Sequence, residues 1–164
     1  MITLAQVLDS LAPDAEYVIQ GDTVLWLDDK IPQPTEDEIE DEKIRLEFED
    51  TRFRKLEEIA EAFDNTVGEF TKTYPEVEKL SWYKQEVEAR AYLADGTESK
   101  FLQAIADKRE VTIDDLAQKI VEKADAYTVA LGEAIGYRQK LEDIVNAATT
   151  LEEIVNVTWD LSET

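Results

Sequence analysis

A seven-residue recurrence of apolar side chains limits the folds open to this chain more than any other feature. An apolar residue stands at every seventh position from Ile39 to Tyr74, without a slip. A second unbroken recurrence runs from Ile113 to Val155. Side chains that return every seven positions lie along one side of an α-helix, where a second helix packs against them. The pattern therefore predicts two long helices with coiled-coil-like seams.

The ends of these helices carry their own signals. Thr35 and Glu38 have the spacing of a capping box, and Pro75 stops the first helix. Thr112 is expected to begin the second long helix, and Thr150 a last short one. The residues expected to pair the long helices are Ile39, Leu46, Phe53, Phe63, Val67, Phe70, Ile120, Tyr127, Leu131 and Leu141. The spacing suits pairing within one chain as well as between the chains of a homodimer or homotrimer, and we expect a homo-oligomer.

The first 34 residues follow a different pattern. A short helix precedes two β-prone runs that flank Gly21-Asp22, which is typical of a β-hairpin. Leu25 and Trp26 fall on opposite faces of the second strand, so we expect both faces to be covered. A unit of this size is too small to be stable alone, and we expect it to dock on the helices or on another protein. The sequence thus predicts a small helix and hairpin module over residues 1–34 and a long-helix bundle over residues 35–164.

Two shorter helices are expected between the long ones. One covers Glu76–Ala94, with an apolar stripe that includes Val77, Leu80 and Val87, and the other covers Ser99–Lys108. Together the elements predict a mainly α fold. It is a long antiparallel helical hairpin or bundle with coiled-coil-like seams, plus a small N-terminal helix and β-hairpin module.

Gly132 and Gly136 lie about one turn apart in the second long helix. Two glycines lower helix propensity by roughly 2 kcal/mol relative to alanine, so we expect a packing reason for them. We interpret them as a place of close contact with a bulky side chain such as Trp82 or Phe70. A bend or a partner-binding groove is the alternative.

The absence of His and Cys from all 164 residues excludes several chemistries. Zinc fingers, haem and iron–sulfur centres, disulfides, Cys nucleophiles and Ser-His-Asp triads all need one of these residues. The densest carboxylate run, from Glu36 to Glu42, lies in an expected helix, where neighbouring side chains diverge. We interpret this run as a solvated helix face, and we expect no enzyme activity, cofactor or metal.

The charge balance bears on possible partners. The chain has 39 acidic and 17 basic residues and a formal net charge of −22. Nucleic acids and anionic membranes repel such a surface, so neither is an expected partner. The N-terminus lacks the basic and uninterrupted apolar regions of a signal peptide, which favours a cytoplasmic location.

Three stretches of the chain carry a family resemblance. The first contains Pro13-Asp14-Ala15, Gly21-Asp22, Leu25-Trp26-Leu27-Asp28 and Pro32-Gln33-Pro34-Thr35. The second contains Ser81-Trp82, Gln85-Glu86 and Glu88-Ala89-Arg90-Ala91-Tyr92-Leu93. The third contains Leu116-Ala117, Ile120, Lys123-Ala124, Tyr127, Gly132, Ile135-Gly136, Arg138-Gln139 and Asp143. In these stretches the chain resembles small helical proteins encoded beside tail-fibre genes in tailed bacteriophages. The resemblance implies a tail-fibre assembly chaperone or a tail structural protein, and it supplies no catalytic residues.

The expected function is therefore non-enzymatic binding of a phage tail-fibre or tail protein. Such a protein acts in the host cytoplasm during assembly or stays in the virion tail as a bracket. Large aromatic side chains dominate binding hot spots, and the partner-binding candidates are Trp26, Trp82, Tyr83 and Trp159. The alternative is an acidic DNA mimic that inhibits a host DNA-binding enzyme, although Lys and Arg interleaved over residues 43–55 weaken a phosphate-like pattern.

Overall fold

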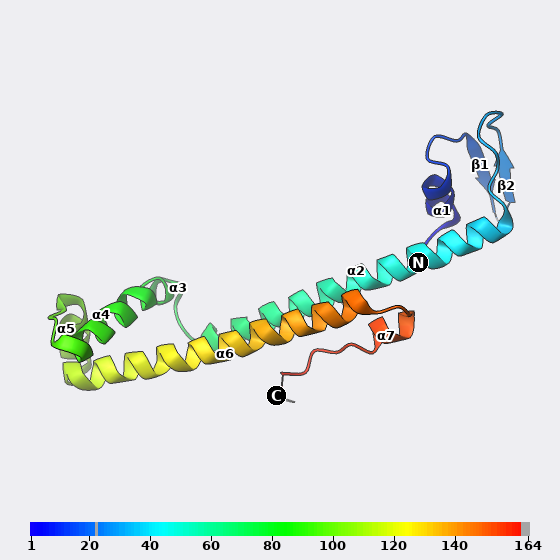
Figure 1. Cartoon of the computed structure of the whole chain (residues 1–164). Coiled ribbons are helices and arrows are strands. Elements are labelled where there is room, and N and C mark those ends of the chain that lie inside the picture. Colours follow the sequence, from blue (N-terminus) through cyan, green and yellow to red (C-terminus); the bar gives the residue numbers. More distant parts are fainter. Residues whose placement is uncertain (22, 162–164) are drawn as a thin grey trace. The chain divides into compact units, whose positions relative to one another are not determined.

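The computed structural model describes residues 1–21 and 23–161, and most of these residues are helical (Figure 1). The described elements are α1 (Leu4–Leu11), β1 (Tyr17–Gln20), β2 (Thr23–Trp26), α2 (Glu36–Thr71), α3 (Glu76–Lys79), α4 (Trp82–Asp95), α5 (Lys100–Arg109), α6 (Ile113–Ala147) and α7 (Leu151–Val155). This confirms the mainly α fold with two long helices, a small N-terminal helix and an antiparallel β-hairpin. None of the helices in the described ranges combines the length and the apolar character that a membrane-spanning segment needs.

The chain forms two compact units, and α2 and α6 each contribute to both. The first unit contains Met1–Glu58 and Leu141–Thr158, and the second contains Ile59–Lys140 together with the described residues from Trp159 onward. The division into a module over residues 1–34 and a helix bundle over residues 35–164 stays a prediction. In the structure, the module and the N-terminal part of α2 belong to the same compact unit.

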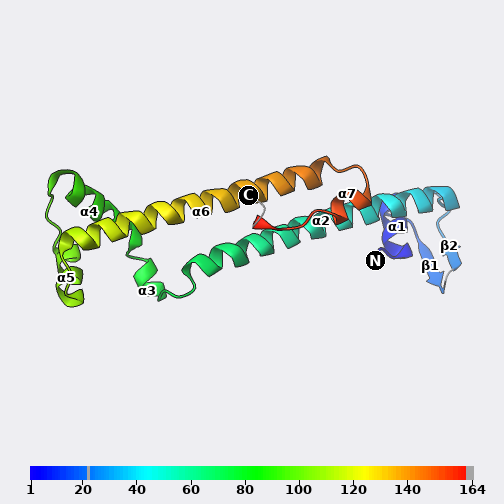
Figure 2. The ribbon, with the colours of Figure 1, turned by 90° about the horizontal axis from the view of Figure 1, so that it is seen from below.

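In the first unit, α1 docks on the N-terminal part of α2 (Figures 1 and 2). Thr3 and Gln6 form a capping box at the start of α1. The buried residues of this helix are Val7 and Leu8. The Ser10 hydroxyl of α1 donates a hydrogen bond to the Glu42 carboxylate of α2. A polar link of this kind orients the small helix, while the buried apolar residues provide the larger part of the packing energy.

The hairpin has a simple register that pairs Tyr17 with Trp26 and Val18 with Leu25. Gly21 takes a positive φ of 61° at the turn, a conformation that glycine adopts without strain. Asp22, the second residue of the predicted Gly-Asp turn, lies outside the described residues. The Tyr17 and Trp26 rings stack on one face with their centroids 5.7 Å apart.

The predicted caps are confirmed at three helices. Glu38 Oε2 accepts a hydrogen bond from the Thr35 amide at 2.8 Å, and Thr35 Oγ1 accepts one from the Glu38 amide at 3.2 Å. Thr112 Oγ1 accepts from the backbone of α6, and Thr150 forms a capping box at the start of α7. The first long helix ends at Thr71, a few residues before Pro75, because a proline restricts the residue ahead of it and lacks an amide donor.

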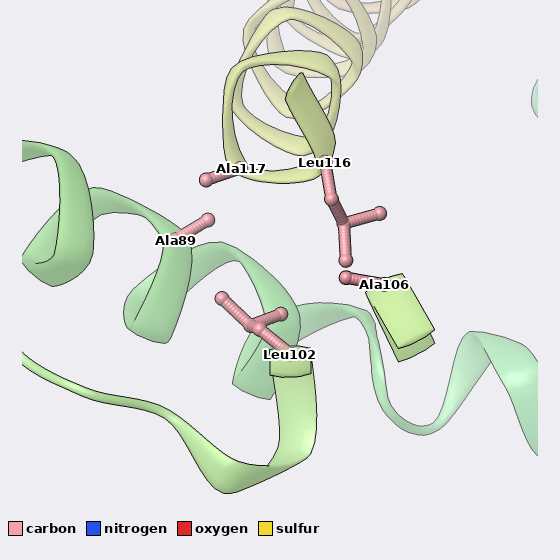
Figure 3. Close-up of a cluster of buried hydrophobic side chains, with 5 residues drawn as sticks. All are labelled: Ala89, Leu102, Ala106, Leu116 and Ala117. Atoms are coloured by element: carbon pink, nitrogen blue, oxygen red, sulfur yellow. The ribbon is translucent and has the colours of Figure 1, made fainter. Parts of the chain in front are cut away.

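The core of the second unit lies where α4, α5 and α6 meet. Figure 3 shows its five buried side chains, of which one comes from α4 and two come from each of α5 and α6. They are Ala89, Leu102, Ala106, Leu116 and Ala117. The alanines allow the helix backbones to approach closely, and the two leucines fill the space between them. Ser99, itself buried, caps α5 by accepting a hydrogen bond from the Leu102 amide at 3.0 Å.

The single helix expected over Glu76–Ala94 is wrong in two respects. It is divided into α3 and α4, and the stripe expected to pack is the exposed side, with Val77 80% and Leu80 85% exposed. The buried side of α4 instead carries Ala89 and the partly buried Tyr92. The sequence pattern favours the longer apolar residues, but α5 and α6 pack on the side where a small residue allows close contact.

The seven-residue rows of the two long helices differ in how deeply they are buried. On α6, Ala134 and Leu141 of the seven-residue recurrence are buried. Val145, four residues after Leu141, is buried as well. On α2 the predicted pairing residue Phe53 is 61% exposed, whereas Ile59, which lies off the seven-residue row, is 2% exposed. The remaining predicted pairing residues are partly buried: Ile39, Leu46, Phe63, Val67, Phe70, Ile120, Tyr127 and Leu131.

The link between α1 and α2 predicts a measurable pH effect. Hydrogen bonds from Arg45 and then from Ser10 lower the pKa of Glu42 from 4.5 to about 2. A carboxylate with a depressed folded-state pKa stabilises the folded chain above its unfolded pKa, and this contribution is lost as the pH falls through about 2. We therefore expect Glu42→Gln to lower the free energy of unfolding near pH 7 and to have a smaller effect near pH 2.

Urea titrations of parent and variant at both pH values measure this difference. Protonation of the other carboxylates affects both chains alike, so the difference isolates Glu42. The exposed Glu40→Gln is the control on the same helix. An equal destabilisation at neutral and acidic pH would contradict the assignment of this contact.

Candidate protein-binding surfaces

Three tryptophans were expected to contact a partner, and the structure places each of them against its own chain. Trp26 stacks on Tyr17, and its Nε1 donates to the Ile31 carbonyl at 2.8 Å. Trp82 and Trp159 each join a cluster of aromatic rings in the second unit. Partner binding by these residues stays a prediction, but their intrachain contacts give all three a structural role.

The first aromatic cluster connects the end of α2 to α4 and α6. The Trp82 ring meets Tyr74 edge-on at a centroid distance of 5.0 Å and Tyr127 at 6.2 Å. Tyr127 also contacts Phe70, at 6.5 Å. Lys123 Nζ donates to the Tyr74 hydroxyl at 3.2 Å, so a polar contact closes the side of the cluster. Edge-to-face rings of this kind add stability beyond the area that they bury.

The second aromatic cluster holds the C-terminal segment on α2 and α6. Trp159 Nε1 donates to Thr66 Oγ1 at 3.0 Å, and its ring lies 6.2 Å from Phe63 and 5.3 Å from Tyr137. The Arg138 guanidinium lies 5.2 Å from the Phe63 centroid, which is a cation–π geometry. Trp159 thus packs back on its own chain, through Phe63, Thr66 and Tyr137.

Tyr83 differs from the tryptophans because its side chain is 79% exposed. It stands beside Val77, Leu80 and Val87, which are 80%, 85% and 48% exposed. We call these four residues the α3–α4 stripe. Next to it, a hollow of about 400 Å³ between α4 and α5 is lined by residues that include Val87 and Phe101.

The hairpin has a second exposed apolar surface. Val18, Leu25 and Leu27 are 40%, 53% and 54% exposed and lie on the face opposite the Tyr17–Trp26 stack. We call them the hairpin face. The expectation that both faces of the hairpin are covered is therefore wrong for the described chain. Side chains alternate between the two faces of the hairpin, so the Tyr17–Trp26 stack occupies one face and leaves Val18 and Leu25 on the other.

The expected close packing at Gly132 and Gly136 is also wrong. A Cβ atom added at either position meets nothing within 4 Å among the described residues. Alanine costs less helix-ordering entropy than glycine, so we expect Gly132→Ala and Gly136→Ala each to raise the free energy of unfolding by about 0.5–1 kcal/mol. Thermal unfolding measures the gain.

Gly96 provides the matched control for these two substitutions. It has a φ of +77° at the end of α4, where a side chain is strained, so Gly96→Ala should destabilise the chain. A loss of stability in Gly132→Ala would indicate that something packs against that face in solution.

Some acidic side chains of α2 form ion pairs with bases of the same helix. Arg45 pairs with Glu42 and Glu49, at 2.6 Å in each case, and Arg54 pairs with Asp50 at 3.1 Å. Within residues 1–21 and 23–161, no group of three or more acidic side chains is arranged to hold a metal ion. Arg45 and Arg54 therefore interrupt the continuous negative face that a DNA mimic needs.

Arg52 is a structural residue that sequence reasoning missed. Its Nη2 donates to the Ala148 carbonyl at 3.1 Å, and its guanidinium lies 4.6 Å from the Phe48 centroid. Ala148 directly follows α6, where the last carbonyls of a helix lack intrahelical donors and attract positive charge. Nothing in the sequence separates Arg52 from Arg45 and Arg54, because all three stand in the same charged run.

Comparison with known families finds a likeness in the C-terminal part of the chain. Residues 122–159 match the family model of the HI1402 helical domain. The matched segment takes in most of α6, all of α7 and Trp159. Over this segment the chain is similar to that domain. No curated protein and no solved structure matches the chain.

Proposed function

We propose that this chain is a non-enzymatic phage tail-fibre-associated protein, which binds a fibre or tail protein during virion assembly. The resemblance of its sequence to small helical proteins encoded beside tail-fibre genes supplies the class of partner. The observation that carries the binding role is the exposed hairpin face. It is an exposed apolar surface on a module too small to bury a large core of its own.

The geometry of the hairpin face favours a particular kind of partner segment. Val18 and Leu25 are directly paired across the strands, so their side chains form one patch with Leu27. The exposed Glu16 lies at the edge of this patch, where its carbonyl accepts from the Leu27 amide. An apolar patch with an acidic border fits a segment of the fibre protein that carries apolar and basic side chains.

The charge of the chain agrees with a chaperone role. A net charge of −22 keeps a protein with exposed apolar patches soluble, and it extends that solubility to a bound assembly intermediate. The DNA-mimic alternative has less support, because Arg45 and Arg54, which pair with carboxylates of α2, interrupt its negative charge.

Co-expression with the tail-fibre protein encoded beside the gene tests the proposal. We expect the chain to co-purify with the fibre protein and to raise the yield of soluble, trimeric fibre. Leu25→Glu should abolish both effects, because it places a charge in the centre of the hairpin face. The control is Val129→Glu, which introduces the same charge at a site on α6 that is 60% exposed. Fibre that is equally soluble with and without the chain, together with no co-purification, would refute the proposal.

Mass spectrometry of purified virions separates the two forms of this role. A transient assembly chaperone should be absent from finished particles, whereas a structural bracket should be present in a fixed ratio to the fibre protein.

A further inference from the structure

The α3–α4 stripe is the largest run of exposed apolar side chains on one helical surface of the described chain. Its members are Val77, Leu80, Tyr83 and Val87, with spacings of three, three and four residues. The short break between α3 and α4 does not interrupt this surface. Leu80 and Ser81 both keep right-handed helical backbone angles, with φ −62°, ψ −21° and φ −94°, ψ −8°. The stripe therefore presents one nearly continuous helical face.

We propose that this stripe pairs with the same stripe of a second copy of the chain, in antiparallel orientation. In a two-fold antiparallel helix pair, residues whose numbers add up to a constant total face each other. With a total of 164 for the residues in the centre of the interface, Val77 faces Val87 of the second copy, and Leu80 faces Lys84 of the second copy. Residues on one flank of such a pair meet at a total two higher, 166, so Tyr83 lies near the two-fold axis, beside Tyr83 of the second copy.

The position of Lys84 favours the antiparallel arrangement over the parallel one. In a parallel pair, the two Lys84 side chains would meet in the same layer and repel each other. In the antiparallel pair, each Lys84 lies across from a leucine, which its aliphatic stem covers while its ammonium group stays in solvent. Within its own chain, Lys84 already pairs with Glu88 and lies 5.5 Å from the Phe101 centroid.

Charge complementarity supports a second copy as the partner. Glu76 and Arg90 lie on the same flank of the stripe, seven residues to either side of Tyr83. The antiparallel pair therefore brings Glu76 against Arg90 of the second copy, twice by symmetry. Residues 76–90 contain four acidic and three basic side chains, a net charge of −1, whereas the whole chain carries −22. Self-association meets far less electrostatic resistance here than the total charge suggests.

The size of the stripe sets the expected affinity. Eleven residues of helix span roughly 16 Å, which is short for a stable interface. We therefore expect a reversible dimer with a dissociation constant on the order of micromolar or weaker. This proposal does not depend on the proposed function, since it uses the second unit alone and needs no fibre protein.

Sedimentation equilibrium of the full chain, over a wide concentration range, tests the proposal. The parent should form a concentration-dependent dimer. Leu80→Glu should weaken the dissociation constant by about tenfold or more, because it places a charge in the centre of the interface. Val129→Glu, an equally charged change at another exposed helical site, should leave it unchanged. Circular dichroism verifies that each variant keeps the helical content of the parent.

A charge-swap experiment tests the register. Glu76→Arg and Arg90→Glu should each weaken the dimer, since each creates two like-charge contacts. An equimolar mixture of the two variants should restore dimerisation, because both contacts of the mixed pair are then attractive. The mixture is decisive because Arg90→Glu also removes the contacts of Arg90 with Glu86 and Asp125 in its own chain.

Three outcomes would overturn the proposal. They are a monomer at every concentration, a dimer that Leu80→Glu does not weaken, and a mixture that fails to restore association. Loss of fibre binding in Leu80→Glu, from a chain that is always monomeric, would assign the stripe to a different protein and not to a second copy.

Discussion

Leu102→Ala should lower the free energy of unfolding by about 3 kcal/mol, because the Leu102 side chain is fully buried between three helices. Removing most of this side chain leaves a cavity among Ala89, Ala106 and Leu116. The neighbouring alanines have no flexible atoms that could move in to fill it. Equilibrium urea unfolding followed by far-ultraviolet circular dichroism measures the loss.

Leu80→Ala is the matched control for this experiment. It removes the same atoms from a side chain that is 85% exposed, so the expected change is within about 0.5 kcal/mol. Similar losses in the two variants would contradict the placement of Leu102 in the core and of Leu80 outside it. The measurement belongs at low protein concentration, where association through the α3–α4 stripe does not contribute.

Trp159→Ala should lower the free energy of unfolding by about 2 kcal/mol, because the indole packs between Phe63 and Tyr137. The expected loss is smaller than for a fully buried tryptophan, since this one is partly exposed. Trp159→Phe keeps a ring but removes the hydrogen bond to Thr66, and it should lose about 1 kcal/mol. Near-ultraviolet circular dichroism should lose intensity in both variants as the ring cluster rearranges.

Tyr83→Ala is the control for the aromatic substitutions, because its ring is 79% exposed and should contribute little to the stability of the monomer. If Trp159→Ala left stability unchanged and abolished binding of the fibre protein, the C-terminal tryptophan would be a docking residue and not part of the fold. Stability and binding must therefore be measured on the same preparation.

Features governed by neighbouring residues could be read from the sequence. The Thr35–Glu38 and Thr150–Glu153 caps form because a side chain three residues away reaches the free amides of the helix end. The hairpin and the buried α6 seam follow from side-chain periodicity, which local backbone geometry sets. These features need no knowledge of what packs against the segment.

The candidate surfaces could be found only in part. The sequence named Trp26, Trp82, Tyr83 and Trp159 alike as partner-binding candidates, and of these Tyr83 is the one that the structure leaves largely exposed. The same residue type serves cores and interfaces. The hydrophobicity of a tryptophan does not reveal whether a ring from a distant part of the chain will meet it. Trp159 and Thr66 illustrate this, since 93 residues separate the donor from the acceptor.

The sequence by itself determined the helices, their caps, the hairpin and the absence of His and Cys chemistry, because each depends on residue type or on spacing within a few turns. The tertiary structure alone decided which side of α4 is buried, that the faces of Gly132 and Gly136 are open, and that Arg52 reaches the end of α6. The physical reason is that burial is a property of two surfaces. A helix with apolar residues on one side and alanine on the other can pack by either, and its neighbours in space select which side is covered.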